Sequence, residues 1–104
     1  METPGSDAFC LYRALVIFPL IPDAIPGVHV ERMAFQPGAR FGGTPHSPGT
    51  REFLACESGE ITLTAAGESW TVQPGDVLSF RGDQRHGYAA GDDGAVGYSV
   101  ILVV

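Results

Sequence analysis

The 104-residue chain contains no lysine and no asparagine, and each absence argues against particular functions. Schiff-base and pyridoxal-phosphate enzymes and P-loop nucleotide hydrolases need a lysine, so none of these is expected. N-glycosylation needs an asparagine acceptor, so that modification is excluded. The two cysteines, Cys10 and Cys56, are too few for a disulfide framework.

Positive charge is scarce as well. Six basic residues, all of them arginine, stand against 12 acidic residues, and the formal net charge is −6. Phosphate binding needs clustered cations, so we expect no direct binding to nucleic acid. The chain also lacks an 18-residue apolar run and a basic leader. These absences predict no membrane contact and a cytoplasmic protein.

Glycine and proline, by contrast, are abundant, with 14 and 8 residues. They interrupt the chain so often that long helices are not expected, and the longest stretch without either spans residues 6–18. With 44% hydrophobic and 17% charged residues, the composition is that of a globular domain. We therefore predict one all-β domain over residues 1–104, with residues 1–8 as a frayed lead-in.

Short strands between closely spaced turns predict a sandwich or a barrel. Residues 60–65 show the strand pattern well, because apolar residues alternate with threonines there. Residues 39–50 are expected to be irregular or an edge. Residues 98–104 are almost continuously apolar, which predicts a strand buried on both faces and a homodimer that covers the second face. The expected strands span residues 9–18, 27–36, 51–57, 60–65, 68–73, 76–80, 85–89 and 95–104.

Two histidines and a glutamate are the residues best suited to carry chemistry. His46 and Glu52 are an even number of residues apart, which places both side chains on one face of an extended segment. His86 would join them from a separate strand. Two imidazoles and a carboxylate suit a divalent zinc, iron, manganese or nickel ion with open coordination positions. The alternative is a solvated edge glutamate with unrelated surface histidines.

The residues around this set resemble the two sequence motifs of the cupin superfamily. In the first motif, His46 stands at the first histidine, Pro48 replaces the second, Glu52 matches the glutamate and Gly59 matches the closing glycine. In the cupin superfamily that this chain resembles, the full metal site consists of three histidines and one glutamate. With Pro48 in place of one histidine, the resemblance implies either a metal held by His46, Glu52 and His86 with water, or a metal-free site.

The second motif is matched by Gly75 and His86, whereas Arg81, Asp83 and Ala90 replace its proline, its second glycine and its asparagine. The resemblance covers about residues 28–104. It implies a cupin-type double-stranded β-helix, which is a jelly-roll barrel.

In such a barrel, strand alternation turns further side chains inward beside Glu52 and His86. The expected ligand pocket is mostly apolar, as small-molecule sites are. Cys56 is expected to be a buried, unreactive thiol. Arg40 is expected to pair with an anionic ligand, with a solvent-facing position as the alternative. The predicted lining consists of Met33, Phe35, Arg40, Leu54, Cys56, Phe80 and Tyr88.

Residues 45–52 and 80–83 look like the C-terminal cupin domain of bacterial XRE-type helix-turn-helix regulators. This likeness implies a module that binds a small-molecule effector, without catalytic residues, as the sensory half of a transcriptional regulator. The alternative is a small metal-dependent cupin enzyme of the dioxygenase, isomerase or epimerase type. A structural cupin without a ligand is a third interpretation.

Overall fold

The computed structural model describes residues 10–12 and 15–103, and that part of the chain contains strands and turns but no helix. The prediction of an all-β chain is confirmed. Within the same residues, no helix capable of spanning a membrane is found. The predicted lead-in, residues 1–8, lies outside the described residues.

Eight strands follow one another in the described part of the chain, joined by turns and loops. They are β1 (Cys10–Tyr12), β2 (Leu15–Pro19), β3 (Val28–Phe35), β4 (Arg40–Gly43), β5 (Arg51–Ala65), β6 (Glu68–Val72), β7 (Val77–Arg81) and β8 (His86–Leu102).

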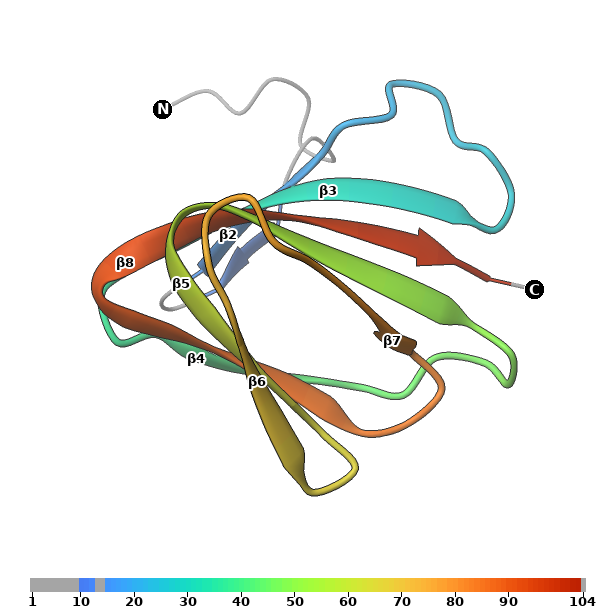
Figure 1. Cartoon of the computed structure of the whole chain (residues 1–104). Helices are drawn as coiled ribbons and strands as arrows, with labels where there is room; N and C mark the ends of the chain where they lie inside the picture. The colour runs from blue at the N-terminus through green and yellow to red at the C-terminus, as the bar shows by residue number, and fades with distance from the viewer. Residues whose placement is uncertain (1–9, 13–14, 104) are drawn as a thin grey trace.

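The two longest strands, β5 and β8, connect the two layers of the barrel. They pair with each other antiparallel along almost their whole length. One half of this pair is flanked by β3, β2 and β1 on the β8 side and by β7 on the β5 side. The other half is flanked by β4 and β6. Figure 1 shows both strands bending together and running from one layer into the other. The result is the predicted jelly-roll barrel.

Turn-forming residues mark the bends of β5 and β8 and not their ends. The register of the pair shifts twice around Gly59, and opposite it the paired residues of β8 jump from Ala90 to Ala95. The prediction that each stretch would form two separate strands was wrong. Bulges let a strand change direction while its pairing continues on both sides.

Two other predicted segments also differ from the observed strands. Residues 9–18 were predicted as one strand, but β1 and β2 pair with each other as a hairpin, with Tyr12 opposite Leu15. Residues 39–50 contain β4, which pairs with β8, so the edge interpretation of this segment is the correct one.

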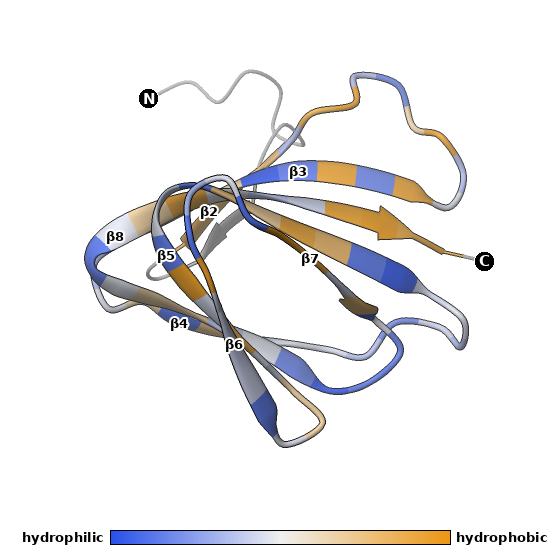
Figure 2. Cartoon of the chain, in the orientation of Figure 1, coloured by the Kyte–Doolittle hydropathy of each residue, from blue (hydrophilic) through white to orange (hydrophobic). Residues whose placement is uncertain are grey.

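Side chains alternate between the barrel interior and the outer surface. On β5, Glu52, Leu54 and Cys56 are buried, whereas the residues between them are half-buried. Figure 2 shows apolar residues on β7 and on the C-terminal half of β8, whereas apolar and polar residues alternate along β3. The apolar core therefore lies between the layers, and the polar interior groups lie at the open end, away from the bends.

The C-terminal half of β8 is buried on one face only. Ser99 and Ile101 are buried, whereas Val100 is half-buried and Leu102 is 39% exposed. Because β3 and β5 flank β8, it is not an edge strand. The expectation of burial on both faces is not met within one chain, and a homodimer that covers the outer face stays a prediction.

The bend at Gly59 provides a test of the fold. Gly59 has φ +72°, and a Cβ added there would overlap Gly94 O and the Ala95 backbone. Gly59→Ala should lower the free energy of unfolding by at least about 2 kcal/mol, because left-handed strain adds to the overlap. Gly67→Ala is the matched control: φ is +78° with no atom within 4 Å, so only about 1 kcal/mol of strain is expected. Urea denaturation measures both values, and equal losses would contradict the bend.

Candidate metal and ligand site

Three polar side chains from separate segments converge at the open end of the barrel. His46 lies in the loop between β4 and β5, Glu52 lies near the start of β5, and His86 is the first residue of β8. One ligand atom from each lies within 4.8 Å of the others. Glu52 Oε1 is 3.3 Å from His46 Nε2, and Glu52 Oε2 is 3.3 Å from His86 Nε2. The three residues predicted as a metal-binding set are therefore neighbours.

The hydrogen bond of His86 directs its Nε2 lone pair at the carboxylate. His86 Nδ1 is 2.8 Å from Gln84 O, and because a carbonyl oxygen only accepts, Nδ1 carries the hydrogen. In the neutral ring, Nε2 is then an acceptor that faces Glu52 Oε2, a second acceptor. Both side chains are at most 2% exposed, so water does not screen them. Both lone pairs face the same space, so a metal ion could bind them together.

The donor set fits a divalent transition metal. Metal-binding histidines usually donate their other ring nitrogen to a carbonyl or a carboxylate, as His86 does. Among the described residues, no fourth histidine, cysteine or carboxylate joins the group. Pro48, at the position of a histidine in the family motif, lies exposed in a turn. Three ligands leave coordination positions open, as in metal sites that exchange small molecules.

Tyr88, two residues after His86 on β8, adds a hydroxyl to this cluster. Its hydroxyl donates to Glu52 Oε2 at 3.4 Å. Burial of the ring, and then the charge of Glu52, raise the pKa of Tyr88 well above its usual value. The hydroxyl therefore stays protonated and serves as a donor.

The loop that carries His46 is tied by backbone hydrogen bonds to the turn before β8. His46 N donates to Gly82 O at 2.8 Å, and Gly82 N donates to Thr50 O at 2.9 Å. These two bonds place the imidazole over Glu52, although the loop has no strand partner of its own.

Asp83 fastens the same loop through its side chain. Its carboxylate accepts from Gly49 N at 2.8 Å and from the Arg81 guanidinium at 3.0 and 3.1 Å. Arg81, and then Gly49 N, lower the pKa of Asp83 to about 2, so the carboxylate stays ionised near neutral pH. The two segments that look like regulator cupin domains thus hold each other in place.

A cavity of about 380 Å³ opens beside His46, Glu52 and His86, the candidate metal-ligand set. This volume lies within the range of small-molecule sites. Its wall combines apolar and aromatic side chains with a few polar ones. The lining includes Ile17, His29, Glu31, Met33, Phe41, His46, Glu52, His86, Tyr88, Ser99 and Ile101.

Of the predicted pocket residues, Met33 and Tyr88 line this cavity. The other apolar ones do not line it and lie in the buried core, to which Met33 and Tyr88 also belong. Phe80 packs its ring against His86, with the centroids 5.6 Å apart, so it supports the site from behind. Side-chain parity predicted inward orientation correctly, but it does not separate residues at the open end from those deeper in the barrel. The predicted pocket residues that lie in the core without lining the cavity are Phe35, Leu54, Cys56 and Phe80.

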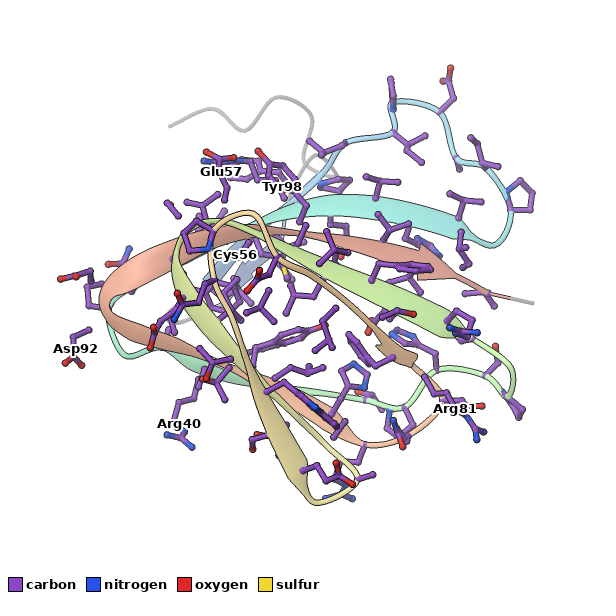
Figure 3. The ribbon with its side chains drawn as sticks, viewed as in Figure 1. Arg40, Cys56, Glu57, Arg81, Asp92 and Tyr98 are labelled. Atoms are coloured by element: carbon purple, nitrogen blue, oxygen red, sulfur yellow. The ribbon has the colours of Figure 1, made fainter. Side chains whose placement is uncertain are left out.

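Arg40 was also assigned to the pocket, with a solvent-facing position as the alternative, and it does not line this cavity. Arg40 is exposed and projects away from the barrel, whereas Cys56 lies inside it (Figure 3). The Cys56 thiol donates to Ser58 O and Gly59 O, and burial raises its pKa. Its predicted burial is confirmed, and its lack of reactivity stays a prediction.

Several lining residues were not predicted. Glu31 and His29 share the strand face of Met33, and that parity could have identified them. Ser99 is paired with Glu31 across the sheet. Phe41 lies in a segment without a regular pattern, and no sequence feature indicated its position.

Comparison with known proteins agrees with this fold. The family model for the cupin domain matches residues 31–103. The cupin domain of an XRE-family transcriptional regulator from Enterobacter cloacae is 30% identical with a TM-score of 0.82, over 88% of this chain and 99% of that one. The chain therefore belongs to the cupin family. Among curated protein sequences, none matches significantly.

Two further solved structures share the fold at lower identity. An HTH_3-family transcriptional regulator from Vibrio cholerae is 24% identical with a TM-score of 0.81, over 88% of this chain and 52% of that one, so the chain spans about half its length. Ectoine synthase from P. lautus is 15% identical with a TM-score of 0.73, over 96% of this chain and 72% of that one. The barrel thus occurs both in regulators and in an enzyme.

Removing the Asp83 carboxylate tests how the His46 loop is held. In Asp83→Ala, amide exchange at Gly49 should speed up by about tenfold or more, because a charge-assisted hydrogen bond is lost. The His46 ring resonances should shift, whereas those of His86, held by Gln84 O, should not. Hydrogen exchange and NMR of the imidazoles measure both effects.

Asp92→Ala is the control, because Asp92 is exposed on β8 and projects away from the barrel (Figure 3). The pKa of Asp83 is lowered in the folded protein. The stabilisation that the Asp83 carboxylate gives to the folded state is therefore complete above the ordinary aspartate pKa and is lost as the pH falls towards 2. Wild-type protein at pH 7 should therefore keep the slow exchange. Unchanged exchange at Gly49 in Asp83→Ala would contradict this role.

Proposed function

We propose that this cupin domain binds a small-molecule effector beside a divalent metal, as the sensory module of a transcriptional regulator. The observation that carries the proposal is the convergence of half-buried His46 with buried Glu52 and His86 at the wall of a cavity of ligand size. The 30% identity to the cupin domain of an XRE-family regulator supports the regulatory context.

The metal would be held by Nε2 of both histidines and by the Glu52 carboxylate. When bound, it would supply a Lewis-acidic centre with open positions towards the cavity. The protein contributes the remaining features: Gln84 O orients His86, the loop bonds orient His46, and Tyr88 donates to the carboxylate. Apolar side chains of the cavity wall, such as Met33 and Phe41, would contact the hydrocarbon part of a ligand.

A small metal-dependent enzyme is the second candidate. Open metal positions beside a tyrosine hydroxyl are compatible with catalysis as well as with binding. Turnover of a bound compound by the isolated domain would favour the enzyme, and binding without conversion would favour the effector module.

Metal binding is tested most directly at His86. Wild-type protein incubated with zinc, manganese or nickel and then dialysed should retain one ion per chain. His86→Ala and Glu52→Gln should weaken affinity by about a hundredfold or more, because a buried ligand is lost. Elemental analysis and calorimetry measure both quantities, and circular dichroism checks the fold.

His29→Ala is the matched control, since His29 lines the same cavity but lies outside the ligand set. It should bind metal as the wild type does. Equal metal content in the wild type and in His86→Ala would overturn the metal assignment.

A second expectation concerns DNA. The domain alone should not shift duplex DNA at physiological salt, because its net charge of −6 repels phosphates. A gel-shift titration with random-sequence duplex checks this. Submillimolar binding would contradict the division into a sensory domain and a separate DNA-binding domain.

A further inference from the structure

The cavity contains a second carboxylate that the metal-ligand set does not use. Glu31 on β3 is half-buried and lines the cavity together with Glu52. Among the described residues, the Glu31 carboxylate has no hydrogen-bond or ion-pair partner. A partly desolvated carboxylate without a partner is costly, so this group is available for a ligand.

Among the described lining residues, no lysine or arginine offers a permanent positive charge to an anionic ligand; the groups there that can become cationic are the histidines. The chain has no lysine, and none of its arginines is among the described lining residues. Arg40, the one arginine expected to line the pocket, projects away from the barrel (Figure 3). The lining thus combines two carboxylates with three histidines, and an anion would gain no permanently charged partner from these side chains.

Strand pairing places Glu31 apart from the metal-ligand set. Glu31 pairs with Ser99, and Glu52 pairs with Ile101, so β8 lies between the two carboxylates. Two strand spacings separate their backbones by about 10 Å across the sheet. One small molecule can thus lie across the cavity and contact both the Glu31 carboxylate and the metal-ligand set.

The aromatic wall favours the same kind of ligand. Phe41 and Tyr88 stack with centroids 6.3 Å apart and planes at 15°, and both line the cavity. Aromatic faces attract cations by about 0.5–2 kcal/mol, most strongly when water is excluded. Partial burial raises the pKa of Glu31; the charges of His29 and His46 lower it, and the charge of Glu52 raises it. A bound cation would act on Glu31 in the same direction as the two histidines.

We propose that the effector carries a protonated amine that pairs with Glu31 at this cavity. This inference rests on the proposed ligand-binding function and specifies the chemical class of the ligand. A primary amine remains cationic at neutral pH, since its pKa is about 10. Its hydrocarbon part would contact Met33, Phe41 and Ile17.

The test uses three probes of matched size: n-butylamine, 1-butanol and butyrate. Metal-free protein is titrated with each at neutral pH, and NMR of the Met33 methyl group and the Phe41 ring reports binding. n-Butylamine should bind at least about tenfold more tightly than butyrate, because a hydrogen bond to a charged partner is worth that much. Butanol should lie between them.

Glu31→Gln should reverse this order, weakening n-butylamine by about tenfold and strengthening butyrate. Glu68→Gln is the matched control, because it removes the same charge from an exposed position on β6 and should preserve the order. Far-UV circular dichroism confirms that both variants fold.

Tighter binding of butyrate than of n-butylamine, no effect of Glu31→Gln, or no binding of any probe would each overturn the proposal. The metal titration of the wild type and His86→Ala distinguishes failure of the amine proposal from failure of the metal proposal. If metal binding depends on His86 while the amine preference is absent, the metal site stands and the ligand class fails. If the amine preference depends on Glu31 while no metal binds, the ligand class stands and the metal fails.

Discussion

The antiparallel pairing of β5 with β8 is the interaction on which the rest of the structure depends. Each strand takes part in both layers, so a single ladder determines how the layers are placed relative to each other. It also determines the site, because Glu52 lies at one end of β5 and His86 at one end of β8. The bend at Gly59 brings these distant ladder positions back to the same open end of the barrel. The metal-ligand set is thus a product of strand curvature, with little contribution from neighbours in sequence.

This dependence explains what could be predicted from the chain. Alternation within a strand is local, so the inward orientation of Glu52, Leu54 and Cys56 followed from the sequence. The predicted neighbours His46 and Glu52 are indeed close, and the family motifs indicated His86 as the third member. Whether Ser58-Gly59 ends a strand or bends it depends on a partner strand 30 or more residues away, so no local pattern determines it.

The pocket lining was harder to predict for a related reason. Parity separates inside from outside but carries no information about depth along the barrel. Phe35, Leu54 and Met33 all belong to the core, but of these three Met33 alone also lines the cavity, together with Glu31 from the same strand. Arg40 was assigned by its parity with His46 and by its charge, although it lies on β4 opposite Ala89, on the outer side of the barrel. The position of a residue along the barrel comes from the register of pairing, which the sequence alone does not display.

The unequal burial of the two histidines has a consequence for the speed of exchange. His46 is 34% exposed and belongs to a loop, whereas His86 is 2% exposed and belongs to a central strand. If the site holds an ion as proposed, His46 would be its more accessible ligand. The residence time of that ion would then depend on the hydrogen bonds that restrain the loop, Gly49 to Asp83 among them, and not on the global stability of the fold. We expect a chelator to withdraw metal faster from a loosened loop while the melting temperature stays nearly constant, and stopped-flow chelation would show whether it does.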